Sequence, residues 1–347
     1  MPTLWFILVA FMLTMYVLLD GFDLGAGIIH LVVARTDAER RLVLRAIGPV
    51  WDGNEVWLIA AGGTLFFTFP LLYASSFSGF YLPLIIVLWL LMGRGIAIEL
   101  RSRLPNGVWS SFWDGVFFVG SALLAIFFGA ALGNVIRGVA LNSQGYFFEA
   151  LWTDFSPFNK NPGILDWYTI LTGILAFAAL LMHGANYIAV KTEGILNERA
   201  RRFSRLGWLL TIPLAILASI ATLFIQPQVY TSFIQRPWGI IFPLLAFVGL
   251  LAAGFFNFRR RDMPALLSSG AFILGMLTSS AFSLYPLVLP SASGTNSLTI
   301  DNASAASYGL AFGLIWWSAG LILAAIYFIM TYRRFWGKVN AASSEEY

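Results

Sequence analysis

The sequence predicts an all-α integral membrane protein with nine transmembrane helices. Of its 347 residues, 59% are hydrophobic and 11% are charged, which is too little polar surface to coat a soluble domain of this size. Apolar stretches long enough to cross a hydrocarbon core of ~30 Å, which takes ~20 helical residues, recur along the whole chain. Basic residues gather in every second connection between these stretches, as they do in the cytoplasmic connections of membrane proteins.

The nine apolar stretches are read in order along the chain as membrane-spanning helices. The first carries acidic residues, is too long for a cleaved signal peptide, and is followed by no small-residue cleavage site. Short polar connections separate the others, apart from two longer segments at 138–164 and 291–307. The predicted helices cover residues 5–32, 50–71, 76–98, 113–136, 165–190, 206–226, 237–257, 265–289 and 308–331.

The distribution of basic residues predicts the orientation. Most of the 21 Lys and Arg residues follow the first, third, fifth, seventh and ninth helices. The opposite connections carry only Arg137, Lys160 and Arg236. Because basic connections stay in the cytoplasm, we expect the N-terminus outside and the C-terminus inside the cell. The basic segments fit this topology and contact with anionic membrane lipid, and they do not predict nucleic-acid binding.

The chain contains few residues that ligate cofactors. It has no cysteine, which excludes disulfides, iron–sulfur clusters and thiolate haem ligation in this chain. His30 and His183 are the only histidines. Two histidines are enough to ligate one haem, but an isolated membrane histidine is more often a hydrogen-bonded packing residue. No metal-ligand spacing, nucleophile elbow or phosphate loop is present.

A short motif near the end of the first helix recurs near the end of the fifth. Residues 19–23 match residues 182–186, so that Asp20 corresponds to His183 and Asp23 to Asn186. A repeat of four helices leaves both copies in the same orientation, which makes this a parallel repeat; a chance match remains the alternative. The intramembrane acids lie in the first copy, which predicts a polar interior there and a packing scaffold in the second.

Asp20 and Asp23 interrupt the first helix one turn apart. A carboxylate at bilayer depth costs several kcal/mol unless it is neutral, paired or hydrated. Nearby glycines permit close approach of a neighbouring helix. We therefore read the pair as a proton-carrying or polar-gate site, against the alternative of a structural cluster paired with an arginine from another helix.

The second helix opens with another acidic pair, in Trp51-Asp52-Gly53-Asn54-Glu55-Val56-Trp57. An ordinary helix N-terminus attracts acids through the helix dipole, and this explains Asn54 and Glu55 well. It explains Asp52 less well, because the residues just before it are apolar. Asp52 is therefore equally well read as a buried titrating group.

The remaining charged residues at depth flank the third and fourth helices. Arg94 lies seven residues from the end of its helix, which is too deep for easy snorkelling, and is a candidate counter-ion for one of the acids. Glu99 lies nearer the end of that helix, and a polar helix end at the headgroups is the alternative for both. Asp114, after Trp113, reads as an ordinary acid at the start of the fourth helix.

Four strings together resemble subunit II of the cytochrome bd-type quinol oxidases. They are Asp20-Gly21-Phe22-Asp23-Leu24-Gly25, Trp51-Asp52-Gly53-Asn54-Glu55-Val56-Trp57, Phe77-Ser78-Gly79-Phe80-Tyr81 and Leu284-Tyr285-Pro286. The likeness runs from the first helix through the ninth. It implies two four-helix bundles and a peripheral ninth helix: residues 1–160 as the first bundle with the intramembrane acids, 161–290 as the second, and 291–347 as an external loop, the ninth helix and a cytoplasmic tail.

The resemblance also implies a function. Complexes of this family oxidise quinol and reduce dioxygen to water with cytoplasmic protons, and subunit I carries the b- and d-type haems and the quinol site. Subunit II has no haem ligands, supports assembly and helps protons to enter. The family's membrane acids match Asp20, Asp23 and Asp52, and Glu99 stands where some relatives have Asp. We place Glu55 on the same path, with supporting positions at Trp51, Asn54, Trp57, Arg94, Asp114 and His183.

Partners follow from the same resemblance. We expect a heterodimer with the haem-bearing subunit I in a bacterial or archaeal plasma membrane, usually with a small single-helix accessory subunit. A structural quinone bound to this chain is left open, as is the choice between ubiquinol and menaquinol. Two other classes also account for the acids: a proton-coupled transporter, which would act without a partner, and a purely structural subunit, in which the acids are dispensable.

Overall fold

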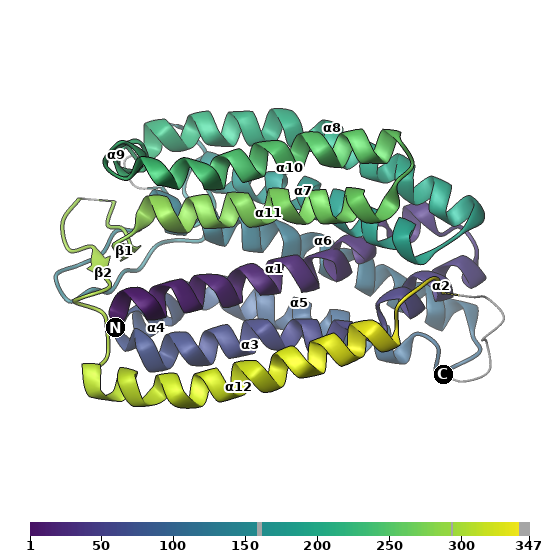
Figure 1. The fold of residues 1–347 in the computed structure, drawn as a ribbon, viewed down its shortest axis with the longest axis horizontal. Helices are drawn as coiled ribbons and strands as arrows, with labels where there is room; N and C mark the ends of the chain where they lie inside the picture. The colour runs from purple at the N-terminus through teal and green to yellow at the C-terminus, as the bar shows by residue number, and fades with distance from the viewer. Residues whose placement is uncertain (158–161, 293, 340–347) are drawn as a thin grey trace.

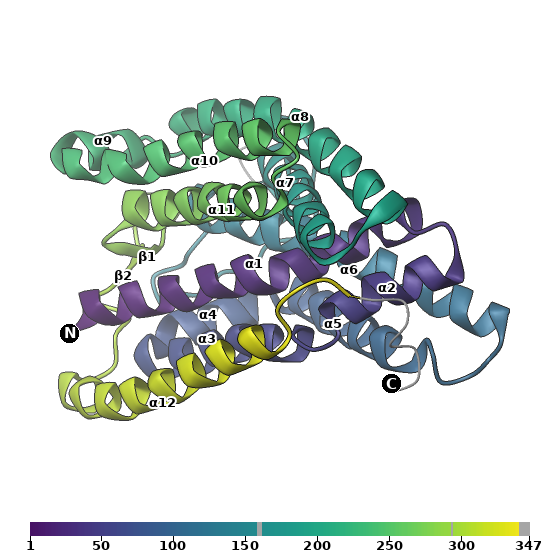
Figure 2. The same cartoon turned by 45° about the vertical axis from the view of Figure 1, so that its right-hand side comes forward.

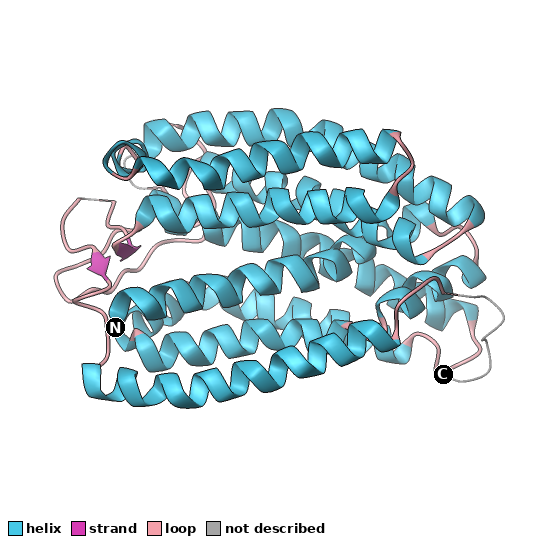
Figure 3. Cartoon of the chain, in the orientation of Figure 1, coloured by secondary structure: helices cyan, strands magenta, loops and turns pink. Residues whose placement is uncertain are grey.

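The computed structural model describes residues 1–157, 162–292 and 294–339, and these are helical almost throughout (Figure 3). One antiparallel pair of short strands, β1 and β2, forms the only named sheet of this described part. The elements in chain order are α1 (Pro2–Val33), α2 (Asp37–Ile47), α3 (Trp51–Thr68), α4 (Pro70–Gly79), α5 (Tyr81–Leu100), α6 (Gly107–Arg137), α7 (Trp167–Lys191), α8 (Gly194–Ile225), α9 (Gln228–Gln235), a 3₁₀ turn (Pro237–Ile240), α10 (Ile241–Phe258), α11 (Asp262–Leu284), β1 (Leu287–Leu289), β2 (Leu298–Thr299) and α12 (Ser307–Arg334).

The long helices run side by side along one direction (Figures 1 and 2). The short helix α2 marks one end of the molecule, here called the α2 end, and β1 and β2 mark the other, the hairpin end. Helix α1 packs on α3 and α6, and α5 packs on α6; among the later helices, α7 packs on α8 and α10 on α11. The contacts α1–α7 and α6–α7 join the early helices α1, α3, α5 and α6 to the later helices α7, α8, α10 and α11. Helix α12 lies at the margin of the molecule, beside α3.

Eight helical segments of the described residues are long and apolar enough to cross a membrane. They are α1, α5, α6, α7, α8, the 3₁₀ turn with α10, α11 and α12. The predicted second span corresponds to α3, whose first turns carry Asp52, Asn54 and Glu55 and so lower its hydropathy. The protein is thus an all-α membrane protein, whereas the count of nine spans and the two-bundle arrangement stay predictions. The predicted domain boundary at 160/161 and the tail 340–347 lie outside the described residues.

Several helix boundaries differ from prediction for local reasons. The predicted connection after α1 contains helix α2, which begins with a capping box in which Thr36 and Glu39 bond each other's backbone N–H groups. Pro70 begins a separate short helix, because proline suits the first turn and lacks an N–H for the helix interior. Helix α11 ends at Leu284 rather than near 289, since Pro286 disfavours the helical conformation of the residue before it.

One face of α1 is buried along nearly its whole length. Its residues follow spacings of three and four, which keeps them on one face of an α-helix. The half nearer the hairpin end is apolar and the half nearer the α2 end is mostly polar. We call this face the α1 stripe: Trp5, Val9, Met12, Tyr16, Asp20, Asp23, Gly27 and His30.

Candidate functional site

The centre of the candidate site is an ion pair between α1 and α5. The Arg94 guanidinium donates from Nη1 to Asp20 Oδ2 at 3.0 Å and from Nη2 to Asp20 Oδ1 at 2.5 Å. Both side chains are fully buried. Two parallel N–H···O bonds fix orientation as well as charge. The protein interior beside α1 therefore holds a buried carboxylate that is paired with one cation.

The same arginine also reaches α3. Arg94 Nη2 lies 3.2 Å from Glu55 Oε2, and the Glu55 side chain is 21% exposed. One cation thus serves two carboxylates, of which the second faces the edge of the helix group. Glu55 and Asp20 come from two of the motifs quoted above, so the fold brings these two motifs onto one guanidinium.

Asp23 lies one turn further along α1 and has no cation. It is fully buried, and among the described residues its one hydrogen-bond partner is the Asn54 amide, whose Nδ2 donates to Asp23 Oδ2 at 2.7 Å. Asn54 Oδ1 in turn accepts from the Tyr332 hydroxyl at 2.9 Å. Tyr332 belongs to α12, and no pattern in the sequence signalled that the last helix would contribute to the site.

Charge counting shows what this group can do. Three carboxyl groups, on Asp20, Asp23 and Glu55, lie together, but the guanidinium of Arg94 bonds only Asp20 and Glu55. An unpaired anion in a buried site is costly, so a group without a cation favours its neutral form. Asp23, which receives only an amide hydrogen bond, is therefore suited to hold a proton that can be given up when a neighbouring charge changes.

A second charged cluster lies at the α2 end. Asp114 is buried two turns inside α6, because that helix begins at Gly107 and not at Trp113. Its carboxylate accepts from His30 Nε2 at 2.6 Å, from Arg40 at 3.0 Å and from Arg101 Nε at 2.8 Å. Asp114 is therefore not the ordinary N-terminal acid that the sequence suggested.

The cluster extends to the surface through α2. Arg101 Nη2 donates to Asp37 Oδ1 at 2.6 Å, and Arg41 pairs with the other Asp37 oxygen. Partial burial of Asp37 opposes its ionisation, but the hydrogen bond and charge of Arg101 outweigh it and lower the pKa of this carboxyl from its usual 3.8. Asp37 thus stays ionised at neutral pH, and its bond to Arg101 holds the guanidinium in contact with Asp114.

Several predicted residues lie elsewhere. Asp52 is exposed on the first turn of α3, and Trp51 beside it is half-buried. Glu99 is 56% exposed and lies 3.7 Å from Arg103. Trp57 is buried and packs against Phe11 and Phe328. The structure of this chain therefore does not bring Asp52 or Glu99 to the Asp20–Arg94 pair.

The matching motif on α7 has a neutral network. His183 Nε2 donates to the Leu18 carbonyl at 3.0 Å, and Nδ1 lies 2.8 Å from Ser269 Oγ. Asn186 bonds Ser269 and accepts from Ser204 Oγ at 2.6 Å. The positions that correspond to Asp20 and Asp23 are thus buried, polar and uncharged.

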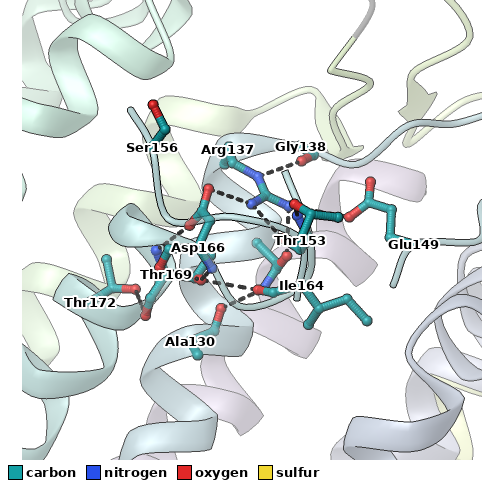
Figure 4. Close-up of polar contacts among 12 residues, drawn as sticks. Ala130, Arg137, Gly138, Glu149, Thr153, Ser156, Ile164, Asp166, Thr169 and Thr172 are labelled. Carbon is teal, nitrogen blue, oxygen red and sulfur yellow. Dashed lines mark hydrogen bonds and ion pairs between the residues drawn. The ribbon is translucent and has the colours of Figure 1, made fainter. Parts of the chain in front are cut away.

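A further ion-pair cluster at the hairpin end is not predicted by the sequence (Figure 4). Arg137 uses all its N–H groups: it pairs with Asp166 at 2.7 Å and Glu149 at 3.3 Å and bonds three further oxygens. Burial raises the pKa of Glu149 above its usual 4.5. Glu149 comes from the segment between α6 and α7, and Asp166 caps the start of α7, so the cluster ties that segment to the helices.

The described residues offer no cluster of three or more His, Asp or Glu side chains that is suited to a metal ion. Both histidines already bond protein groups through at least one ring nitrogen. The acids that do gather are bonded by arginine or by an amide, which suits proton or charge handling better than metal ligation.

Comparison with known proteins gives one consistent result. A family model described as cytochrome bd terminal oxidase subunit II matches residues 1–335. The chain is 32% identical to a probable cytochrome oxidase subunit 2 of Haemophilus influenzae, over 97% of this chain and 95% of that one. It is 29% identical to the cytochrome bd-I ubiquinol oxidase subunit 2 of Escherichia coli K12, over 99% and 95%.

Further similarity extends to a Gram-positive bacterium and to a solved structure. The cytochrome bd ubiquinol oxidase subunit 2 of Bacillus subtilis is 32% identical over 88% of this chain and 87% of its own length. The structure of the bd oxidase from Geobacillus thermodenitrificans contains a chain that matches with a TM-score of 0.74 at 18% identity, over 96% and 98% of the two chains. This last likeness concerns the fold.

Proposed function

The chain belongs to the family of cytochrome bd terminal oxidase subunit II, and on this premise we propose that it is the haem-free second subunit of a quinol oxidase that lines part of the proton entry path. The complex would oxidise quinol and reduce dioxygen to water in a bacterial plasma membrane. The observation that carries the proposal is the buried group of Asp20, Asp23 and Glu55 around Arg94.

Water formation consumes protons, and a buried reaction centre needs groups that deliver them. Asp20 and Asp23 lie on the half of α1 nearer the α2 end, which carries most of the basic connections. With that end in the cytoplasm, the acids face the compartment from which protons are taken. Asp23, which lacks a cation, is suited to exchange a proton, while Asp20 is held by Arg94. Asp52, Glu55 and Glu99 would accept protons nearer the surface.

The partner would supply the redox chemistry. Both His30 and His183 are held in side-chain hydrogen bonds within this chain, which supports a chain without haem. The b- and d-type haems would then lie in subunit I. The exposed apolar side chains on α12, such as Ile315, Leu323 and Ile329, suit contact with lipid or with another membrane helix. A small accessory helix and a structural quinone remain expectations from the family.

The test replaces single carboxyl groups in the assembled oxidase. We expect Asp23→Asn and Asp52→Asn to lower oxygen consumption at saturating quinol on the order of tenfold or more, because a lost proton-transfer group costs ~10²–10⁴ when transfer limits the rate. Haem content and co-purification of the subunits should stay at wild-type levels, which separates a relay role from failed assembly.

The matched control is Glu193→Gln. Glu193 is 73% exposed and its single ionic contact, with Lys338, is 4.0 Å long, so its loss should leave turnover unchanged. Wild-type turnover in both aspartate variants across a range of pH would reject the relay and favour a structural role for the acids. Substrate uptake by the isolated chain, without a haem protein, would favour the transporter alternative.

A further inference from the structure

Buried polar atoms without a hydrogen-bond partner collect along the α1 stripe. Among the described residues eight buried side-chain N or O atoms have no partner. Five of them lie on the stripe or against it: His30 Nδ1, Ser121 Oγ, Asp23 Oδ1, Arg94 Nε and Tyr16 Oη, of which Tyr16 Oη also faces the Asp20 carboxylate. An unsatisfied buried polar atom costs ~1–3 kcal/mol, and native proteins leave few of them. Five along one line therefore need an explanation.

The residues that carry or face these atoms follow one another along α1 at intervals of three or four positions, and each of these positions is called a level. Ser121 of α6 faces Gly27, where an added Cβ would meet the Ser121 side chain and, at 3.2 Å, Phe117. Arg94 lies at the level of Asp20. Along α1 the successive levels are therefore those of Tyr16, Asp20, Asp23, Gly27 (which faces Ser121) and His30. Steps of three or four residues rise ~4.5–6 Å, which is the distance that one water molecule spans between two hydrogen-bonding atoms at ~2.8 Å each.

The α2 end of this line is closed by a histidine with a fixed tautomer. The Asp114 carboxylate, flanked by Arg40 and Arg101, only accepts hydrogen bonds, so His30 Nε2 carries the proton that lies on it. His30 Nδ1 is then a bare lone pair, fully buried and directed away from Asp114. It needs a donor, and none of the described side chains supplies one.

We propose that the α1 stripe binds a file of ordered water molecules from Tyr16 to His30, held at Ser121, and that the His30–Asp114 pair is a proton-accepting site at its α2 end. This proposal rests on the proposed function and extends it to residues outside the quoted motifs. Buried water typically makes about three hydrogen bonds to groups that otherwise have no partner, and the unpartnered atoms provide these positions.

Proton movement along such a file makes and breaks only N–H and O–H bonds. Each water accepts one proton and passes another to its neighbour. His30 takes a proton at Nδ1, becomes an imidazolium with Nε2–H still on Asp114, and returns the Nδ1 proton to the adjacent water. The cluster lies close to the surface, because Arg40 and Asp37 are 25% and 51% exposed, so solvent protons reach it over a short distance.

The test uses three variants of the assembled oxidase. His30→Gln keeps a donor for Asp114 but cannot take up a proton, and Ser121→Ala removes one hydroxyl that bonds no protein group. We expect both to lower turnover about tenfold and to raise the H₂O/D₂O rate ratio, since proton delivery becomes limiting. Ser75→Ala is the control: Ser75 Oγ is also buried and unpartnered but lies on α4, away from the stripe.

The possible outcomes separate this proposal from the preceding one. If Asp23→Asn slows turnover while His30→Gln and Ser121→Ala leave the rate and the isotope ratio unchanged, the file is rejected and the proton path stands. If Asp23→Asn also behaves as wild type, both are rejected. Should His30→Gln not assemble, Ser121→Ala decides. In a high-resolution map of the complex, water within ~3 Å of both His30 Nδ1 and Ser121 Oγ would support the file, and dry packing there would overturn it.

Discussion

Arg94 is the residue whose loss should harm the fold most. Among the described residues it is the only cation bonded to the carboxylates of Asp20 and Glu55. Removing one partner of a buried ion pair leaves an uncompensated charge and typically costs ~3–5 kcal/mol. We therefore expect Arg94→Gln to lower the stability of the purified complex by about this amount, measured by denaturant titration in detergent.

The second variant in this comparison is Arg94→Gln combined with Asp20→Asn. The buried Asp20 anion is then removed together with its cation, and only the partly exposed Glu55 is left without one, so part of the lost stability should return. Arg103→Gln, at a side chain that is 69% exposed, should change stability little, because surface ion pairs contribute ~0–1 kcal/mol. A double variant no more stable than Arg94→Gln alone would show that charge pairing is not the cause.

Glu149 predicts a pH dependence at the hairpin end. Burial raises its pKa in the folded protein above the usual 4.5, so the folded state binds more protons than the unfolded state just above pH 4.5. Stability from this group is therefore complete at lower pH and is lost as the pH rises through the folded-state value. Melting temperatures of Glu149→Gln relative to wild type should rise across that window and level off above it; a constant difference would contradict the shift.

At the level of single residues, the sequence predicted which groups matter better than how they pair. The acids and Arg94 were recognisable because charges at membrane depth are rare. Their pairing was not, because Asp20 and Arg94 lie 74 residues apart and spacing carries no information over that distance. Asp114 was misread for a local reason: polar residues before Trp113 hid the first two turns of α6. Tyr332 lies one residue beyond the predicted ninth helix, and an isolated histidine such as His30 indicates a packing residue.

Among the helices, the crossing of α1 and α7 depends on two glycines. A Cβ added to Gly25 would lie 2.7 Å from the Cα and N atoms of Gly184. Backbone atoms cannot yield as a flexible side chain does, so the helices would have to separate. We expect Gly25→Ala to reduce the yield of assembled complex strongly, measured by co-purification.

Gly107→Ala is the control for the Gly25→Ala variant. Gly107 begins α6 at an exposed position, and nothing lies within 4 Å of an added Cβ. Alanine favours a helix by ~1 kcal/mol over glycine, so assembly should be unchanged or improved. Equal yields for the Gly25→Ala and Gly107→Ala complexes would mean that α1 and α7 tolerate separation.

Hydropathy located most of the helices, and its failures have physical causes. It responds to the mean polarity of a window, so α3, with three polar residues in its first turns, scores below helices of similar length. It does not detect amphipathic helices outside the bilayer, such as α2, whose start depends on the cap formed by Thr36 and Glu39. Breaks at Pro70 and Pro286 were visible as residues, but a membrane helix can also tolerate proline.

For the whole molecule, we predict that the working unit contains a second, haem-bearing subunit. A tag on this chain should co-isolate a haem protein in mild detergent, whereas this chain expressed alone should give no haem band in a reduced-minus-oxidised spectrum. Both histidines are already bonded within the chain, which is the reason for the second expectation. A stoichiometric b-type band that disappears with His183→Phe would overturn it.

The change of character along the α1 stripe has an electrical consequence. Trp5, Val9 and Met12 continue the buried face beyond Tyr16 with apolar side chains. The half of α1 nearer the hairpin end is therefore apolar and is in series with a polar half nearer the α2 end. Tyr16 is near the middle of α1, so a charge that reaches it from the α2 end crosses about half of the transmembrane voltage. At ~2.3 kcal/mol per elementary charge per 100 mV, each such proton would do about 1.2 kcal/mol of electrical work at 100 mV. Charge displacement recorded across a vesicle membrane during one turnover would measure this fraction directly.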